Sequence, residues 1–324
     1  MTFKTGIVGF GKMGVIRADI VKAHPDLTLD AICENNDGDE ELKDYKDLLK
    51  LEPDIVFVCT PPNVSCDIIA DALDAGCHVF AEKPPGRNLM DLQKVIRAAN
   101  RNPDCKLQFG FNHRYHPSIM LAKEVVDSGD LGKLLSVRGI YGKSGEPDYE
   151  NTWRAKKDIA GGGILIDQGI HMLDIMQELC GEFTEVHAIS STLHWPMEVE
   201  DNVFVLMQSK DGIPCFLESS MIEWRHIFQL KLNLSWGYVL IKGILTHSGT
   251  YGPEKIVIAR KTYKEGKIGN PDEDIQSWDE DLSFGREVNA FVKSIKEDLP
   301  VENGDLEDAI SIMKLIERIY EEKP

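Results

Sequence analysis

The sequence predicts an α/β domain with a parallel, doubly wound sheet, followed by an α+β domain with a largely antiparallel sheet. In the first part of the chain, short apolar runs alternate with helical patterns, as expected where helices connect parallel strands. Beyond it, strand-like runs follow one another with few helices between them. The 324 residues exceed what one domain usually holds, so we place the domains at 1–120 and 121–324.

The first predicted domain alternates strand and helix. Gly76 and Asn88 fit the end of one helix and the N-cap of the next. Strands are expected over 6–10, 27–33, 54–60, 78–82 and 106–112, and helices over 13–23, 64–76, 89–100 and about 118–128.

The second predicted domain opens with a strand over 134–141 and a helix over about 164–179, preceded by three glycines. Its antiparallel sheet is expected from runs at 185–193, 202–209, 214–221, 228–235 and 255–260. A last amphipathic helix is expected over 306–320.

Composition limits the compartment and the partners. The formal net charge of −18 argues against binding nucleic acid or an anionic membrane surface. The seven cysteines include no C-x-x-C pair, which favours a reducing compartment over a disulfide framework. No apolar run approaches the ~18 residues of a membrane span, and no signal segment is recognisable. We therefore expect a cytoplasmic protein.

A G-x-G-x-x-G pattern follows the first predicted strand and opens a helix, which is the context of a dinucleotide-binding βαβ unit. Its glycines would permit a tight turn, a close approach to pyrophosphate, and close helix–sheet packing. The expected cofactor contacts in this loop are Gly9, Phe10, Gly11, Lys12, Met13 and Gly14.

Glu34 ends the second predicted strand, where a carboxylate can bind ribose hydroxyls and repel a 2′-phosphate. Residues 34–42 contain no Lys or Arg to hold such a phosphate. The sequence therefore favours NAD over NADP, although Glu34 could also be a solvated loop charge.

The stretch AGGGILIDQGIHMLD, residues 160–174, places Asp167 and His171 four residues apart on an apolar helical pattern. Glycine weakens a helix, and a carboxylate beside an imidazole is unusual on an apolar face. The glycines would let the backbone approach a cofactor and substrate without a Cβ in the way. This stretch is a candidate catalytic segment.

Together with CTPPN (59–63) and AEKPP (81–85), the GGGILIDQGIH segment (161–171) makes the chain resemble the Gfo/Idh/MocA family of sugar and polyol oxidoreductases. The resemblance implies a Rossmann domain followed by an open-faced α/β domain. It implies a catalytic set of Lys83, Asp167 and His171. It also implies cofactor contacts from Thr60, Pro61, Asn63, Glu82 and Lys83.

Two departures from the family pattern stand out. Ser65 occupies a position where members often have a histidine. The segment GFNHRYHP (110–117) resembles the family's N-R-aromatic stretch but carries extra histidines.

The implied chemistry is oxidation of a secondary alcohol. His171 suits the base that removes the hydroxyl proton, because imidazole titrates near neutral pH. Lys83 would stabilise the alkoxide, and Asp167 would orient the imidazole or bind a neighbouring hydroxyl. Simpler roles stay open for each: a surface lysine, a core histidine and a helix-start carboxylate.

The expected substrate is a sugar, a sugar phosphate, a nucleotide sugar or a polyol. The segment NTWRAKKDIAGGG (151–163) combines an aromatic residue with several cations. An aromatic ring stacks on sugar C–H groups, and cations suit a phosphate. The segment could instead be a solvated loop with Trp153 at a dimer contact. Expected substrate contacts are Lys83, Arg114, Tyr115, Trp153, Arg154, Asp167 and His171, with Lys143 or Lys156 as further candidates.

Two other functions remain open at this stage: an NAD-retaining glycosidase that acts by transient oxidation, and a non-enzymatic NAD-sensing regulator. A metal site is not expected, because the sequence has no H-E-x-x-H motif or close His/Cys pair. The family resemblance and an uncovered sheet face predict a homodimer or homotetramer.

Overall fold

The computed structural model describes residues 2–34, 42–246, 248–264 and 266–322. The chain forms two compact units. The first unit contains Met1–Asn112, Asp158–Gly161 and Phe284–Lys314, and the second contains His113–Lys157, Gly162–Ser283 and Leu315–Pro324.

The first unit is built on a five-stranded parallel sheet with the order β2-β1-β3-β4-β5, which confirms the predicted doubly wound α/β domain. The central strands are short and apolar because helices cover both of their faces. The strands are β1 Phe3–Val8, β2 Leu27–Cys33, β3 Ile55–Val58, β4 His78–Ala81 and β5 Leu107–Phe109.

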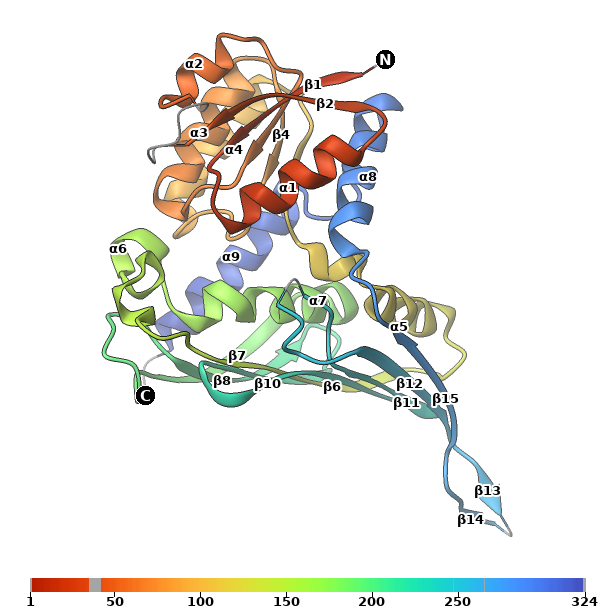
Figure 1. The fold of residues 1–324 in the computed structure, drawn as a ribbon. Helices are drawn as coiled ribbons and strands as arrows, with labels where there is room; N and C mark the ends of the chain where they lie inside the picture. Colours follow the sequence, from red (N-terminus) through yellow and green to blue (C-terminus); the bar gives the residue numbers. More distant parts are fainter. Residues whose placement is uncertain (1, 35–41, 247, 265, 323–324) are drawn as a thin grey trace. The chain divides into compact units, whose positions relative to one another are not determined.

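Helix α1 (Lys12–Ala23) covers one face of this sheet, and α3 (Pro62–Asp74) and α4 (Leu89–Arg101) lie on the other (Figure 1). A short helix, α2 (Tyr45–Leu49), follows β2. The Asn88 side chain accepts a hydrogen bond from the Asp91 N–H at 2.9 Å, which confirms the predicted N-cap of α4.

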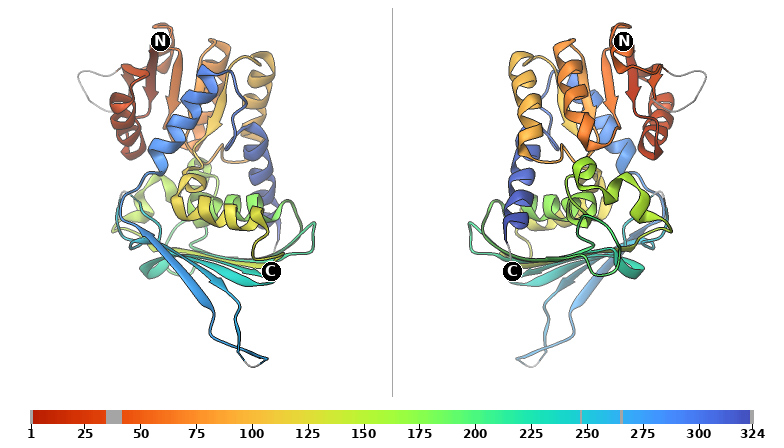
Figure 2. Two further views of the ribbon diagram at one scale, coloured as in Figure 1. Left: turned by 90° about the vertical axis from the view of Figure 1, so that its right-hand side faces the viewer. Right: turned by 90° about the vertical axis from the view of Figure 1, so that its left-hand side faces the viewer.

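Helix α8 (Ser283–Lys296) was not expected from the sequence, and it packs in the first unit beside α1 (Figure 2). Its Val288, Phe291 and Val292 join a core cluster that includes Phe57 and Phe80 of the sheet. The predicted division at residue 120 therefore needs a correction: the compact unit ends at 112 and recovers residues 158–161 and 284–314 from later in the chain.

The second unit is built on an eight-stranded sheet with the order β15-β12-β11-β10-β6-β9-β8-β7. Its neighbours pair antiparallel except β6 and β9, which pair in parallel, so the predicted largely antiparallel sheet is confirmed. The strands are β6 Leu134–Ser144, β7 Phe183–Ser191, β8 Asn202–Ser209, β9 Pro214–Ser220, β10 Ile222–Leu234, β11 Gly237–Lys242, β12 Glu254–Arg260 and β15 Asp272–Trp278.

Strands β11 and β15 and the small hairpin of β13 (Tyr263–Lys264) and β14 (Lys267–Ile268) were not expected. The sequence of β15, DEDIQSW, is acidic and mostly exposed, because this strand lies at the sheet edge. An edge strand of this composition lacks the apolar alternation from which strands are predicted.

Helices α5 (Pro117–Ser128) and α7 (Ile170–Cys180) cover one face of this sheet (Figure 1). Gly139 of β6 lies directly beneath α7, since a Cβ there would stand 2.5 Å from the Met176 methyl group. On the opposite face, Leu206 is 55% exposed and Phe204 is 37% exposed. This face carries apolar side chains that no element of the second unit covers in the part of the chain that the structure describes.

The remaining elements are short, apart from the last helix. They are the 3₁₀ turns Asn112–Tyr115, Tyr149–Asn151 and Trp153–Ala155, helix α6 Lys157–Ala160, the π-helical turn Leu165–Gly169 and helix α9 Leu306–Glu321. Among the described residues, no helix is long and apolar enough to cross a bilayer.

We expect Phe291→Ala to lower the free energy of unfolding of the first unit by about 3–5 kcal/mol, because it empties a fully buried position. Urea denaturation measures the change. The matched control is Lys293→Ala on the exposed side of the same helix, with an expected effect within about 0.5 kcal/mol. Equal midpoints for the two variants would contradict the placement of α8 in this core.

Candidate active site

The register of the parallel sheet gathers the predicted cofactor residues at one edge. Val8 pairs with Val58 and Val58 with Ala81, so these three strands reach their carboxyl ends in one row. Parallel sheets of this kind bind ligands just beyond that edge. The residues that follow the strands there include Gly9, Glu34, Thr60 and Lys83.

The glycine loop has the shape that a pyrophosphate requires. Gly9 has a φ of +89°, which favours glycine, and a Cβ on Gly14 would stand 2.1 Å from the Gly9 carbonyl oxygen. A Cβ on Gly11 would meet no atom within 4 Å among the described residues, so the space over this position is open. Helix α1 begins at Lys12 without a side-chain cap, which leaves its first N–H groups available to an anion.

Glu34 lies against the glycine loop. The Phe10 N–H donates a hydrogen bond of 2.6 Å to Glu34 Oε2. This contact fits a carboxylate that also binds ribose hydroxyls. Residues 35–41 of the predicted cation-free loop lie outside the described residues.

The Thr60 hydroxyl lies buried beside the same edge. Within the described part of the chain it has no hydrogen-bond partner. A buried hydroxyl normally has one, so Thr60 Oγ1 is suited to a ligand atom that the protein itself does not supply. Together with the glycine loop and Glu34, this fits a dinucleotide.

Glu82 forms a buried ion pair in the first unit. Its carboxylate accepts a 2.8 Å hydrogen bond from Arg17 Nε, and Arg17 also donates to Glu287 at 2.8 Å. Burial opposes the charge of Arg17, but Glu82 and Glu287 outweigh it and raise the pKa of the guanidinium. The side chain of Glu82 therefore faces Arg17, and Lys83 follows at the end of β4 as a half-buried residue.

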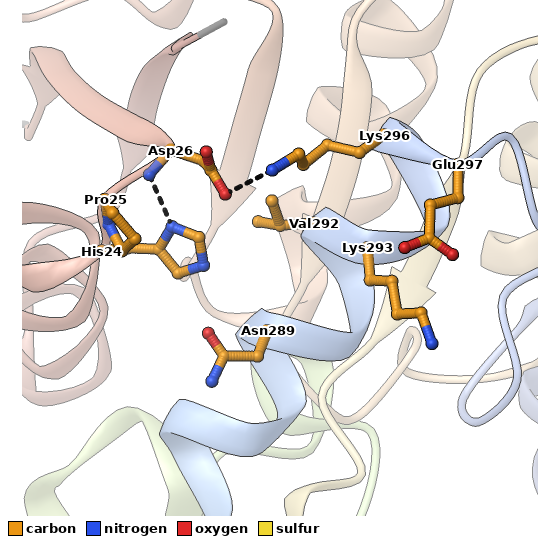
Figure 3. A pocket seen from close by; sticks show the side chains of 8 residues that line it. All are labelled: His24, Pro25, Asp26, Asn289, Val292, Lys293, Lys296 and Glu297. Carbon is orange, nitrogen blue, oxygen red and sulfur yellow. Dashed lines mark hydrogen bonds and ion pairs between the residues drawn. The ribbon is translucent and has the colours of Figure 1, made fainter.

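A shallow pocket of the first unit lies at the opposite end of the sheet, where β2 begins (Figure 3). Asp26 there pairs with Lys296 of α8 at 2.8 Å and donates its N–H to His24 Nδ1 at 3.1 Å. These exposed groups satisfy one another, and the pocket contains none of the predicted site residues.

In the second unit, the predicted helix over about 164–179 is a π-helical turn followed by α7. Asp167 lies in the π turn and accepts a hydrogen bond from Lys143 Nζ at 3.0 Å. Arg154 Nε lies 3.6 Å from the other carboxylate oxygen. The structure therefore brings Asp167 together with two of the predicted substrate cations.

Two glycines of the run lie close to other parts of the second unit. A Cβ on Gly162 would stand 2.1 Å from the Tyr320 hydroxyl, and one on Gly163 would stand 1.9 Å from the Glu200 carbonyl oxygen. These two glycines make room for protein atoms, so the expectation that they clear space for a cofactor is not needed to explain them.

Sequence reasoning missed Glu200. Its carboxylate accepts hydrogen bonds from the Gly163 and Leu165 N–H groups at 2.9 and 3.1 Å, and from Tyr320 at 2.9 Å. Burial raises its pKa, and the hydrogen bonds oppose this shift. Glu200 thereby anchors the start of the segment that carries Asp167 and His171, and no local motif marks it.

His171 is 5% exposed and stacks on His113, with ring centroids 3.9 Å apart and planes inclined by 13°. His113 Nε2 lies 3.1 Å from the Tyr141 hydroxyl. Two positive charges at this separation repel by about 4 kcal/mol at an effective dielectric constant of ~20. The pair therefore holds one positive charge far more readily than two.

The Arg114 side chain is 8% exposed and forms a buried ion pair. Its guanidinium donates to both carboxylate oxygens of Asp174, at 2.8 and 2.6 Å, and lies 3.6 Å from Glu178. Tyr115 is also buried. Asp174 thus has a structural partner, and the predicted substrate roles of Arg114 and Tyr115 stay predictions.

Trp153 and Arg154 lie together in a short 3₁₀ turn, with the guanidinium 4.3 Å from the indole ring. Both are half-buried, whereas Lys156 is exposed. Of the predicted substrate-binding cations, Lys143 and Arg154 lie near Asp167. No group of three or more His, Cys, Asp or Glu side chains suited to a metal occurs among the residues that the structure describes.

Two family models match the chain. Residues 3–111 match the oxidoreductase family with an NAD-binding Rossmann fold, and residues 119–235 match the GFO/IDH/MocA C-terminal domain. Together the two matches span more than half of the chain.

Curated relatives align over part of their length. Levoglucosan dehydrogenase of Pseudarthrobacter phenanthrenivorans is 33% identical over 181 residues, which is 55% of this chain and 46% of that protein. Myo-inositol 2-dehydrogenase of Thermotoga maritima is 32% identical over 59% of each chain. D-glucoside 3-dehydrogenase of Escherichia coli is 27% identical over 67% of this chain and 70% of its own.

Solved structures share the whole fold. Levoglucosan dehydrogenase in complex with NADH superposes with a TM-score of 0.87 at 20% identity, covering 99% of this chain and 97% of that one. The WlbA dehydrogenase from Bordetella pertussis, in complex with NADH and UDP-GlcNAcA, has a TM-score of 0.81 at 18% identity over 99% and 96%. The glycine loop, the two sheets and both family matches agree, and the chain belongs to the Gfo/Idh/MocA family of NAD-binding oxidoreductases.

Proposed function

We propose that this protein is an NAD-dependent oxidoreductase that transfers hydride between nicotinamide and a secondary alcohol of a sugar-type substrate. The observation that carries the proposal is the shared carboxyl edge of β1, β3 and β4, where the glycine loop, Thr60 and Lys83 follow the strands. The names of the aligned relatives, which include levoglucosan, myo-inositol and D-glucoside dehydrogenases, support the same reaction class.

The first unit would hold the cofactor. The glycine loop and the start of α1 present N–H groups to the pyrophosphate, and Glu34 binds the adenosine ribose. We assign further contacts to Thr60, Pro61, Asn63 and the main chain of Glu82. Bound NAD supplies the hydride acceptor.

We propose that Lys83 and His171 act on the same substrate hydroxyl. His171 accepts the hydroxyl proton as the hydride leaves the carbon, so the alcohol loses two electrons and two hydrogens to become a carbonyl. The Lys83 ammonium hydrogen-bonds the oxygen and stabilises its developing negative charge. Asp167, whose carboxylate accepts a hydrogen bond from Lys143, orients the His171 imidazole or binds a neighbouring substrate hydroxyl.

The substrate is assigned to sugars, sugar phosphates, nucleotide sugars and polyols. Trp153 offers an aromatic face, and Lys143 and Arg154 place positive charge beside Asp167. This combination suits a sugar with several hydroxyls, and it tolerates an anionic substituent.

We further propose that the protein is cytoplasmic and forms a homodimer or homotetramer through the open face of the second sheet. Ile189 and Phe204 are register partners on that face, and Leu206 opposes Phe216 of β9. Exposed apolar side chains on adjacent strands are typical of an interface between copies.

A panel of sugars, polyols, sugar phosphates and nucleotide sugars tests the function, with NADH absorbance as the readout. We expect stoichiometric NADH formation with at least one class. Release of sugar without NADH would indicate a glycosidase instead.

Lys83→Ala should lower kcat by at least ~10²-fold with nearly unchanged NAD affinity, because it removes a charge that stabilises the oxyanion. The exposed Lys94→Ala is the control.

Glu34→Ala should narrow the preference for NAD over NADP, because it removes both a ribose acceptor and a repulsion of the 2′-phosphate. The ratio of kcat/KM for the two cofactors measures this. Asp30→Ala, an exposed carboxylate on the same strand, should leave the ratio unchanged. A wild-type protein that prefers NADP would refute the assignment of Glu34.

Leu206→Asp should convert the oligomer to a monomer of about 36 kDa, because it places a charge in an apolar interface. Light scattering after size-exclusion chromatography measures the mass. Leu299→Asp, at an exposed position of the first unit, should leave the mass unchanged. The interface is misplaced if the Leu206 variant keeps the wild-type mass.

A further inference from the structure

The histidines of the GFNHRYHP segment have no role in the function proposed above. His113 is 4% exposed and lies in the 3₁₀ turn Asn112–Tyr115. Its ring covers one face of the His171 ring at 3.9 Å, and its Nε2 contacts the Tyr141 hydroxyl at 3.1 Å. A polar side chain is thus buried against the group to which we assign proton transfer.

The surroundings hold the His113 ring in place. Tyr141 of β6 and Phe228 of β10 contact it, with ring centroids at 5.6 and 5.9 Å. His116 meets its edge at 5.4 Å. His113 is therefore enclosed by rings from β6, β10, α7 and the N-cap residue of α5.

Several charged groups near the pair have a partner of opposite charge. His116 Nδ1 lies 2.7 Å from Glu254, which also accepts the Ser118 N–H at 2.8 Å. Arg114 pairs with Asp174, one helical turn beyond His171. Asp167, in the preceding turn, accepts from Lys143. Tyr141 is deeply buried, which raises the pKa of its phenol, so its hydroxyl stays protonated.

We propose that His113 is a positioning residue: it is an uncharged platform that fixes the plane of the His171 ring while His171 takes the proton. This inference rests on the proposed function, because it gives a role to the base of that reaction. The stacking contact fixes the plane of the His171 ring, and the contact with the Tyr141 hydroxyl fixes the plane of the His113 ring. Repulsion between two stacked positive rings keeps His113 neutral whenever His171 is charged.

Three variants distinguish the contribution of the His113 ring from that of its hydrogen bond with Tyr141. His113→Phe keeps an aromatic platform and should hold kcat within about threefold of the wild type. His113→Ala removes the platform and should lower kcat roughly 10- to 100-fold, with KM for the substrate changed much less, because the base loses its orientation. Tyr141→Phe keeps the packing and removes the same hydrogen bond as His113→Phe, so kcat should again stay within about threefold of the wild type. Thermal unfolding shows whether each variant is folded.

Nitrogen-15 NMR of the histidine rings tests the platform without cofactor or substrate. Between about pH 9 and pH 5 we expect His113 to be neutral at any pH at which His171 carries the positive charge. The exposed His187 serves as the ordinary reference. His171 should give one sharp set of ring signals in the wild type and His113→Phe, and several or broadened signals in His113→Ala.

The outcomes are distinct. The proposal is overturned if His113 is the ring that charges, if the ring signals of His171 are the same in all variants, or if His113→Ala keeps wild-type kcat. If no alcohol is oxidised by the wild type, the proposed function fails, and the ring signals still decide whether His113 positions His171.

Discussion

The buried guanidinium of Arg17 is the interaction on which the architecture of the first unit depends. It joins α1 to Glu82, 65 residues away, and to Glu287, 270 residues away. Removing one partner of such a buried ion set commonly costs 3–5 kcal/mol, because the remaining charge stays out of water. The set therefore holds α8 on the sheet and keeps the carboxylate before Lys83 in the interior. The position of Lys83, which we assign to the oxyanion, therefore depends on an ion pair that does not itself touch the substrate.

The second unit uses buried polar groups in the same way. Glu200 receives the N–H groups at the start of the π turn, and Arg114 holds Asp174 in α7. Apolar contacts pack a deeply buried helix well, but they do not by themselves fix its rotation about its own axis. Directional hydrogen bonds at its start and middle fix that rotation, and with it the positions of Asp167 and His171. The proposed chemistry thus depends on carboxylates that are themselves not reactive.

The parts that sequence could predict are those encoded locally. The alternation of strand and helix, the glycine loop and the cap at Asn88 depend on residues a few positions apart, and the structure confirms them. The parts that it could not predict depend on distant contacts. Nothing near residue 287 indicates a partner at Arg17, and nothing near Glu200 indicates the N–H groups of Gly163 and Leu165. The ion pair of Arg114 could not be predicted either, because its partner Asp174 lies 60 residues away.

The acidic composition is compatible with an anionic cofactor, because the positive potential at the glycine loop comes from the main chain and not from the net charge of the protein. A net charge of −18 acts over the whole surface and is screened by salt beyond about 10 Å. A pyrophosphate at the glycine loop meets main-chain N–H groups and the partial positive end of α1, which act at contact distance. In the proposed binding mode, Glu34 faces the ribose, so its negative charge does not oppose the phosphates. Local main-chain dipoles can therefore hold a dinucleotide on a strongly acidic protein.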